Sequence, residues 1–361
     1  MAGASIGRSL NVEPRIPIQN LYYLFCYAWN RLEEGEVVDV GGVDSPELVD
    51  LFAKVLTGGI RHLIRRGIDR GYVPVEEELS VLRGRVNFQG SMQLMLRRAP
   101  RLHCEFDELR HDILTNQILK ATMSRLVRVA GIDKELSHEL LILSRVFDKV
   151  SEPRLSKHLF RQVQIYRNNS FYDFLIRICE LIYESTLPEG SGDRYRFSDI
   201  LRDEQKMARV FENFVRNFYR LEQTQYQVTP LQMRWDAISD EGQLQMLPLM
   251  RTDIHLENAD RRIIIDTKYY SEALQTYHGK ASIRSEHLYQ LFSYLKNAEA
   301  LGPAYSDAEG VLLYPAVGDK LAFDAHIQGH HIRVCTVNLD QPWQLIRSDL
   351  LSVIGLNVAQ D

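Results

Sequence analysis

Two short apolar segments, residues 250–256 and 263–269, lie on either side of a polar stretch at residues 257–262. This pattern is typical of two adjacent β-strands joined by a turn. Side chains alternate between the two faces of a strand, so Asp266 and Lys268 are expected to project together on one face. The sequence therefore predicts a β-hairpin that presents a carboxylate and a lysine side by side.

The first strand of this predicted hairpin carries a second carboxylate, Asp253. Oxygen ligands suit a hard cation such as Mg²⁺, so Asp253 and Asp266 are predicted to be metal ligands. Lys268 would orient an attacking water molecule or stabilise the negative charge that develops on a phosphate. An isolated Asp-x-Lys pattern also fits a solvated strand edge with a surface ion pair. The second acid favours a Mg²⁺-dependent phosphodiesterase site.

Amphipathic helices are predicted before and after the hairpin. Residues 285–296 have an apolar stripe at helical spacing, and Gln290 and Tyr294, four residues apart, share one face of this helix. Residues 204–222 have a similar stripe, and Glu212 lies at its edge. A carboxylate in that position is either a solvated surface group or a group that faces a site.

The length of the chain, 361 residues, is enough for two domains. Residues 187–193 are rich in turn-forming residues and are predicted to be a linker between residues 1–187 and 188–361. The first part is mainly helical by its periodicity, with helices at residues 20–31, 46–66, 113–130 and 134–150 and short strands within 73–86. The second part adds strands at residues 228–238, 310–314 and 332–339, an order typical of an α/β core.

Charge and hydropathy narrow the range of functions. The formal net charge is −5, whereas proteins that bind nucleic acid alone usually carry excess lysine and arginine. The chain is therefore expected to bind DNA weakly without a partner. No long apolar run marks a signal peptide or a membrane span, which predicts a cytoplasmic location. No complete phosphate-binding loop is found, so any nucleotide-driven step is assigned to a partner.

Cysteine and histidine residues do not favour a metal centre. The four cysteines are far apart in the sequence and are expected to be buried apolar residues, namely Cys26, Cys104, Cys179 and Cys335. Three histidines, His326, His330 and His331, could bind zinc. The intervening Gln328 and Gly329 are predicted to form a turn that distributes them over two strand faces, so structural or surface roles are favoured.

Several segments are more specific to one protein family than the Asp-x-Lys pattern is. In the first part of the chain they are residues 16–29, 83–86 and 106–120, and in the second part they are residues 251–253, 265–270, 288–291 and 335–339. Together they resemble the McrC family, the nuclease subunits of McrBC modification-dependent restriction systems, over nearly the whole chain. One departure is Thr252, which stands where the wider PD-(D/E)xK nuclease superfamily carries a proline before its first acid.

The resemblance implies a fold and a division of labour. Residues 1–187 would form an α+β, mainly helical domain that binds a partner and stimulates its GTPase. Residues 188–361 would form an α/β restriction-endonuclease-like domain of the PD-(D/E)xK type. The partner would be an McrB-like AAA+ GTPase hexamer, which binds GTP and delivers double-stranded DNA containing modified cytosine. This chain would cut that DNA with Mg²⁺.

The resemblance also implies roles for individual residues. Asp253, Asp266 and Lys268 would be catalytic, with the two aspartates as metal ligands. Glu212 would supply an extra acid to the metal shell, and Gln290 would line the DNA side of the site. The intact catalytic residues argue against a non-enzymatic adaptor. A standalone Mg²⁺-dependent repair or processing nuclease of the RecB-like branch is the remaining alternative.

Two arginines of the first part are candidates for partner binding. Arg83 and Arg85 flank Gly84. Our hypothesis is that they belong to a loop that contacts the GTPase ring. An ordinary basic turn is the alternative.

Overall fold

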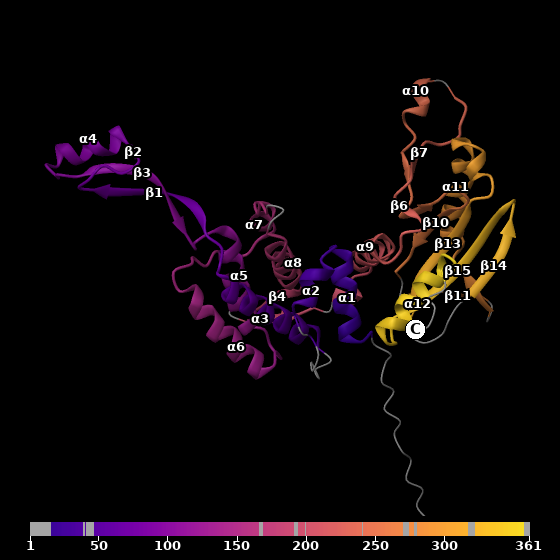
Figure 1. Ribbon diagram of the computed structural model, residues 1–361, viewed down its shortest axis with the longest axis horizontal. Coiled ribbons are helices and arrows are strands. Elements are labelled where there is room, and N and C mark those ends of the chain that lie inside the picture. The colour runs from indigo at the N-terminus through magenta and orange to yellow at the C-terminus, as the bar shows by residue number, and fades with distance from the viewer. Residues whose placement is uncertain are drawn as a thin grey trace, which may run out of the picture. The chain divides into compact units, whose positions relative to one another are not determined.

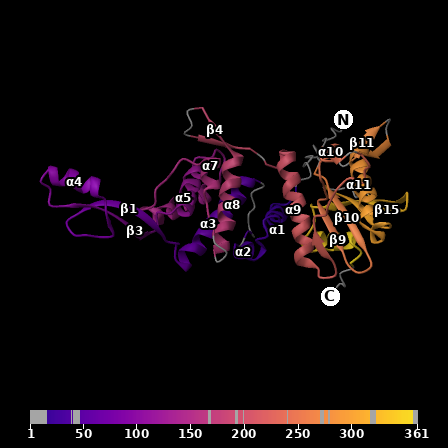
Figure 2. The ribbon, with the colours of Figure 1, turned by 90° about the horizontal axis from the view of Figure 1, so that it is seen from above.

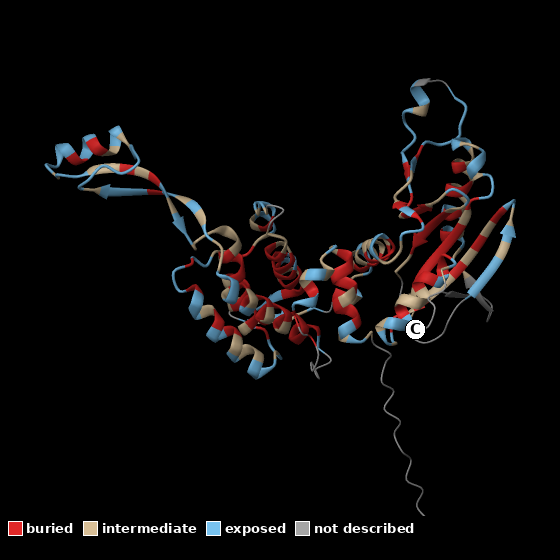
Figure 3. Cartoon of the chain, in the orientation of Figure 1, coloured by how far each residue is buried: buried red, intermediate tan, exposed pale blue. Residues whose placement is uncertain are grey.

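The computed structural model describes residues 16–38, 40, 47–165, 169–190, 194–198, 200–239, 241–269, 274–277, 280–316 and 322–356. Figures 1 and 2 show its ribbon in two views. The chain divides into two compact units. The sheet unit comprises Met1–Leu32 and Ile200–Asp361, and the helical unit comprises Glu33–Asp199. Each unit has its own core of buried residues, coloured red on the cartoon in Figure 3.

A six-stranded mixed sheet forms the centre of the sheet unit, in the order β14-β15-β13-β10-β9-β6. β10, β13 and β15 are parallel, and the remaining pairs are antiparallel. The strands are β6 (Gln227–Thr229), β9 (Ile254–Glu257), β10 (Arg262–Thr267), β13 (Glu309–Ala316), β14 (Ala322–Ile327) and β15 (His330–Asn338). Ile263, Ile264 and Ile265 of β10 are buried, so both faces of this central strand are covered.

Three helices pack against the sheet. α11 (Ser285–Ala298) covers β10 and β13, where Leu291 joins Ile264 in one apolar cluster. α9 (Glu204–Glu222) contacts β6 and β10. α12 (Trp343–Val353) contacts β15. The catalytic strand predicted from the sequence, β10, therefore lies between the elements that carry the predicted supporting residues.

The first helix, α1 (Ile18–Ala28), belongs to the sheet unit although it is far away in the sequence. It packs on α9, where the Tyr27 hydroxyl donates a hydrogen bond to Glu222 Oε1 at 2.5 Å. Asn20 Nδ2 donates another to the Leu339 carbonyl oxygen at 2.8 Å. These contacts explain why the compact unit includes the start of the chain.

The first strand of the predicted hairpin is interrupted. β8 (Met250–Arg251) pairs with β7 (Gln232–Met233), and β9 begins only at Ile254. In the break, Thr252 N donates to the Leu231 carbonyl oxygen, and Leu231 N donates to Thr252 Oγ1, each at 3.0 Å. The other short elements of the sheet unit are η3 (Ile200–Arg202), α10 (Glu241–Leu244), β11 (Leu274–Tyr277), β12 (Lys280–Ile283), η4 (Glu299–Leu301) and η5 (Pro303–Tyr305).

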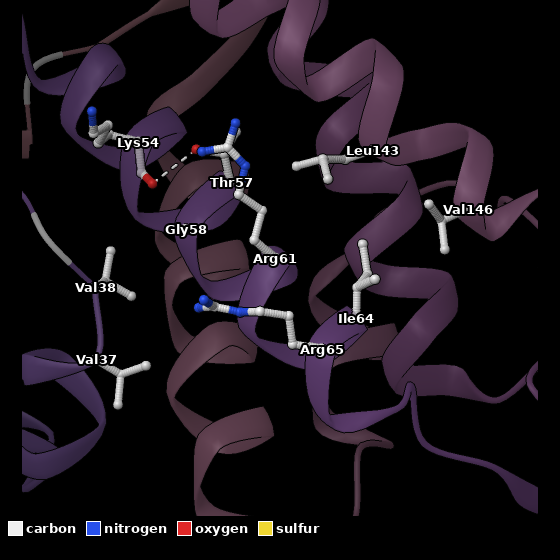
Figure 4. A pocket seen from close by; sticks show the side chains of 10 residues that line it. All are labelled: Val37, Val38, Lys54, Thr57, Gly58, Arg61, Ile64, Arg65, Leu143 and Val146. Carbon is white, nitrogen blue, oxygen red and sulfur yellow. Dashed lines mark hydrogen bonds between the residues drawn. The ribbon is translucent and has the colours of Figure 1, made fainter.

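Four longer helices form the core of the helical unit, namely α3 (Leu48–Arg66), α5 (Leu114–Val127), α6 (Lys134–Ser144) and α8 (Ser170–Ser185). Shorter elements are α2 (Leu32–Glu36), η1 (Arg145–Phe147), α7 (Lys157–Arg161), β4 (Thr186–Glu189) and β5 (Arg194–Phe197). The Tyr172 hydroxyl links α8 to α5 by donating to Asn116 Oδ1 at 2.9 Å. A groove of about 670 Å³ runs along α3, lined by aliphatic side chains and by Lys54, Arg61 and Arg65 (Figure 4).

A small sheet with one helix projects from these helices (Figure 1), and we call residues 71–110 the arm. It contains β1 (Gly71–Leu79), β2 (Arg85–Val86), α4 (Phe88–Leu96) and β3 (Leu102–Arg110), with the strand order β1-β3-β2. Val75, Cys104 and Phe106 form its core. Gly84 has a φ of +67°, and a Cβ there would lie 2.4 Å from the Glu105 carbonyl oxygen, so this turn requires glycine.

Most predicted elements are present. The helix predicted at residues 204–222 coincides with α9, and the helix predicted at 285–296 lies within α11. The mixed helix-and-sheet architecture of the second part is confirmed. Elements that were not predicted include α4, β3, α8 and α12. β3 was missed because its acidic and basic residues obscure the alternating pattern of a strand.

The linker predicted at residues 187–193 is wrong. Residues 187–189 belong to β4, which pairs with β5, and Arg125 Nη2 ties this hairpin to α5 by donating to the Thr186 carbonyl oxygen at 2.6 Å. The segments on either side of the turn formers are therefore paired strands, and residues 191–193 lie outside the described part. The two units divide near residue 199, and α1 packs with the second part. The roles assigned to residues 1–187 and 188–361 stay predictions.

The turn predicted between the histidines is confirmed, because Gln328 and Gly329 have positive φ angles and connect β14 to β15. His330 is buried, and its two ring nitrogens each lie 2.8 Å from an oxygen, one of Ala308 and one of Glu299. These contacts give His330 a structural role. Three cysteines are buried and one is partly buried, in the order Cys26, Cys104, Cys179 and Cys335.

Candidate active site

Asp266 lies near the end of β10, where its side chain is 1% exposed. Lys268 Nζ lies 2.8 Å from Asp266 Oδ2, in agreement with the predicted alternation. Apart from this contact, no residue that the structure describes donates a hydrogen bond to either carboxylate oxygen of Asp266. A buried carboxylate without donors is unfavourable unless a cation or a proton compensates its charge.

Asp253 lies in the break between β8 and β9. Thr267 donates two hydrogen bonds to Asp253 Oδ2, one from its backbone N and one from Oγ1, both at 2.8 Å. Asp253 is also close enough to Asp266 for its charge to raise the pKa of that carboxyl group. The structure therefore brings the two predicted metal ligands into one site.

Lys268 connects this strand to α11. Its Nζ donates a hydrogen bond to Gln290 Oε1 at 2.8 Å, and Gln290 Nε2 donates one to the Tyr294 hydroxyl at 2.9 Å. The spacing of four residues places Gln290 and Tyr294 on the same helix face, as predicted. The Lys268 side chain is 14% exposed. Its ammonium group is therefore held between a carboxylate and an amide.

The pKa values of this pair depend on burial and on neighbouring charges. Burial raises the pKa of the Asp266 carboxyl to about 7, and the charge of Asp253 acts in the same direction. For Lys268, burial lowers the pKa, but the carboxylates of Asp266 and Asp253 outweigh burial and leave it raised. Lys268 is charged at neutral pH, while Asp266 is near the midpoint of its titration. Such a combination is typical of functional sites.

Glu212 of α9 is linked to the site by an arginine of the same helix. Arg216 Nη1 donates to Glu212 Oε1 at 2.7 Å and to the Asp253 carbonyl oxygen at 3.2 Å. The charge of Glu212 contributes to the raised pKa of Asp266, after burial and the charge of Asp253. Glu212 is thus near the two aspartates, and one of its oxygens is bonded to a guanidinium group.

The donor set fits a magnesium ion. Asp266 supplies two buried oxygens to which no described residue other than Lys268 donates, and Asp253 lies next to it. Mg²⁺ is commonly held by one or two protein carboxylates and completes its octahedron with water and phosphate oxygens. Within the described ranges, no group of three or more His, Cys, Asp or Glu side chains is arranged to hold a metal ion. Asp253 and Asp266 are the two predicted ligands that the structure brings together.

Arg83 and Arg85 lie in the arm and not in the sheet unit. The Arg83 guanidinium stacks on the Phe106 ring at 4.0 Å from its centroid, and its Nη2 lies 3.6 Å from Glu108 Oε1. Arg85 is an exposed residue of β2. The contacts of Arg83 stabilise the arm, and both arginines are exposed.

Two residues near the site were not predicted. Thr267 holds the carboxylate of Asp253, and Arg216 joins Glu212 to the backbone at Asp253. The spacing of four residues between Glu212 and Arg216 is a signal for an ion pair on a helix. No sequence signal exists for the contact of Thr267, because it depends on the break in the neighbouring strand.

Fold and site together define a class of protein, an α/β chain whose mixed sheet carries two carboxylates and a lysine around the end of a central strand. A family model described as "McrBC 5-methylcytosine restriction system component" matches residues 7–315. The chain belongs to this family, and the predicted resemblance is confirmed. No helix in the part of the chain described above combines the length and the hydropathy needed to cross a bilayer.

Two known proteins are similar over most of the chain. The "Type IV methyl-directed restriction enzyme EcoKMcrBC" of Escherichia coli (strain K12) is 31% identical over 348 residues, which are 94% of this chain and 98% of that protein. A solved half-complex from a tetradecameric assembly of Thermococcus gammatolerans McrB AAA+ hexamers with bound McrC contains a chain of similar fold, with a TM-score of 0.57 and 17% identity. That match covers 93% of this chain and 76% of the other.

Proposed function

We propose that this chain is the Mg²⁺-dependent DNA endonuclease subunit of a GTP-dependent, modification-dependent restriction complex. The observation that carries the proposal is Asp266, a buried carboxylate that lies beside Asp253, contacts Lys268 Nζ and accepts no hydrogen bond from any other described residue. Membership of a 5-methylcytosine restriction family supports DNA as the substrate of this site.

The residues of the site suit phosphodiester hydrolysis. Asp253 and Asp266 would hold the magnesium ion, which when bound supplies positive charge to the phosphate and lowers the pKa of bound water. Thr267 keeps the Asp253 carboxylate in place. Lys268, fixed by Asp266 and Gln290, would donate to the scissile phosphate and stabilise the charge that develops there.

The helical unit would bind an McrB-like AAA+ GTPase ring and stimulate its GTP hydrolysis. The arm exposes several large apolar side chains, namely Val81, Leu82, Phe88, Met92, Met95 and Leu96, each at least 59% exposed. An apolar surface of this kind is typical of a protein-binding site. In the similar solved complex, McrC is bound to McrB AAA+ hexamers. The partner would bind GTP and deliver DNA containing modified cytosine, because a net charge of −5 disfavours DNA binding by this chain alone.

The test of the nuclease role is cleavage of methylated duplex DNA by the chain with its GTPase partner, GTP and Mg²⁺. Asp266→Ala and Lys268→Ala should each lower the cleavage rate by at least about 100-fold, because each removes charge from the transition-state site. Asp260→Ala, in the exposed hairpin turn, is the control and should cut normally. A folded Asp266→Ala protein that cuts at the wild-type rate would exclude this site as the nuclease. Full activity without partner or GTP would instead indicate a standalone nuclease.

The test of the partner role uses the arm. The double variant Phe88→Ser, Met95→Ser removes apolar surface from α4 and should reduce both binding to the ring and stimulation of its GTPase. Leu141→Ser in α6, where the leucine is 47% exposed, is the matched control. If the double variant stimulates the partner GTPase as strongly as Leu141→Ser does, the arm does not bind the ring.

A further inference from the structure

The Arg216 guanidinium group connects α9 to the break between β8 and β9. Its side chain is 12% exposed. Nη1 donates to Glu212 Oε1 at 2.7 Å and to the Asp253 carbonyl oxygen at 3.2 Å, and Nη2 donates to Asn213 Oδ1. A planar group with five donors can satisfy three acceptors at once. A lysine ammonium, a single point charge on a flexible stem, cannot reproduce this geometry.

The backbone around Asp253 depends on such contacts because it belongs to neither β8 nor β9. On one side, Thr252 exchanges two hydrogen bonds with Leu231. On the other side, Thr267 holds the Asp253 carboxylate. Arg216 holds the Asp253 carbonyl oxygen between these two anchors. The position of the Asp253 side chain therefore depends on an arginine four residues after Glu212.

Arg216 also balances the charge of the site. Three carboxylates meet at this site: Arg216 joins Glu212 to the backbone of Asp253, and the Asp253 carboxylate accepts from Thr267, the residue after Asp266. Two cations face them, Arg216 beside Glu212 and Lys268 beside Asp266. Because Arg216 is paired with Glu212, a divalent cation is favoured at the two aspartates over Glu212.

We infer that Arg216 is a positioning residue for cleavage. It fixes the peptide of Asp253 and neutralises Glu212, so that the cation is bound by Asp253 and Asp266 and not by Glu212. The inference rests on the proposed function of this site and adds a residue to it. Glu212 is then a partner of Arg216 and not a metal ligand.

The test compares Arg216→Lys with the wild-type protein in two measurements. The first is Mn²⁺ binding to the free chain by isothermal titration calorimetry, without DNA. The second is the single-turnover cleavage rate of the complex as a function of Mg²⁺ concentration. The lysine variant keeps the charge but loses the bridge, so Mn²⁺ affinity should fall roughly tenfold and the cleavage rate roughly 10- to 100-fold. Arg220→Lys is the matched control on the same helix, where Nε donates to the Val228 carbonyl oxygen, and both measurements should stay at wild-type values.

A second pair of variants separates positioning from charge. Arg216→Met leaves Glu212 without this cation, and the double variant Glu212→Gln, Arg216→Met restores the charge balance without restoring the bridge to Asp253. The cleavage rate should be low in both. A double variant that cuts within about twofold of the wild-type rate would reduce Arg216 to a neutralising charge and overturn its positioning role. These variants also decide the question if the lysine variant does not fold.

The remaining outcomes are distinct. A folded Arg216→Lys protein with wild-type Mn²⁺ affinity and wild-type rate overturns the inference and leaves the proposed nuclease intact. A wild-type chain that neither binds Mn²⁺ nor cuts in its complex overturns the proposed metal site, and the inference with it.

Discussion

The Asp266 carboxyl group couples the stability of the sheet unit to pH. Its pKa in the folded protein is raised by burial to about 7, whereas an aspartate of an unfolded chain titrates near about 3.9. Between these values the folded state holds a proton that the unfolded state has released. The free energy of unfolding therefore falls as the pH rises through this range. The penalty is fully developed above about pH 7, where the folded state must bury the ionised group.

Asp266→Asn should remove this pH dependence. In the metal-free protein at pH 8, the variant is expected to be more stable than the wild type by on the order of a few kcal/mol. Urea unfolding of both proteins between pH 4 and pH 8 measures the effect, and saturating Mg²⁺ should flatten the wild-type curve because a cation favours the ionised carboxylate. Asp260→Asn, an exposed turn residue, should follow the wild-type curve. Parallel curves for Asp266→Asn and wild type would contradict the raised pKa.

Gln290 and Tyr294 support Lys268 by a chain of two hydrogen bonds. Gln290→Ala removes the acceptor that holds the ammonium group, so cleavage should slow by roughly tenfold without a loss of Mn²⁺ affinity. Tyr294→Phe removes only the second bond and should have a smaller effect. Single-turnover rates at saturating Mg²⁺ measure both variants. Wild-type rates in both would show that Lys268 does not need this support.

At the scale of elements, the arm is a small sheet with a correspondingly small core. Its main apolar contacts are those of Val75, Cys104 and Phe106. A three-stranded sheet with so few buried side chains depends on its turn geometry. Gly84 provides that geometry, because its positive φ and its contact with Glu105 exclude a side chain.

Gly84→Ala should loosen the arm. The left-handed backbone and the close approach to β3 together cost about 1–3 kcal/mol. Hydrogen exchange measured by mass spectrometry should show faster exchange in residues 102–110, with unchanged Mn²⁺ binding and reduced stimulation of the partner GTPase. Gly131→Ala is the control, because Gly131 also has a positive φ but no atom near its missing Cβ. Equal protection of residues 102–110 in wild type and Gly84→Ala would argue against a structural need for glycine.

At the scale of the whole molecule, the two compact units do not follow the order of the chain. The sheet unit combines α1 with the segment after residue 199, because α1 forms hydrogen bonds with Glu222 and Leu339. The helical unit extends to β5, which pairs with β4. A cut at residue 187 therefore separates β4 from β5 and leaves the apolar face of α1 without α9.

Two fragments test this division. Residues 33–199 should unfold in one cooperative thermal transition and elute as a compact monomer. Residues 1–187 should be less stable and should bind a hydrophobic dye, because the buried face of α1, including Leu21 and Phe25, becomes exposed. Circular dichroism melts and size-exclusion chromatography compare the two. A more stable 1–187 fragment would show that α1 does not need the sheet unit.

The sequence by itself predicted what depends on local periodicity. Alternation in the strand placed Asp266 beside Lys268, and a period of 3.6 residues placed Gln290 beside Tyr294 and set the limits of α9. These features require only neighbours within a few residues. The resemblance to a family covered the rest of the chain, and its family assignment is confirmed.

Only the tertiary structure decided the contacts between distant segments. The two hydrogen bonds from Thr267 to Asp253, the bridge of Arg216 and the packing of α1 on α9 all join residues that no periodic pattern relates. The same holds for β5, whose pairing with β4 converted an expected linker into a hairpin. Such contacts form because the chain buries its apolar side chains and pairs its buried backbone polar groups across the whole fold, and not within one segment. The local sequence pattern therefore identified the carboxylates of the site, and the tertiary fold determined that they lie together.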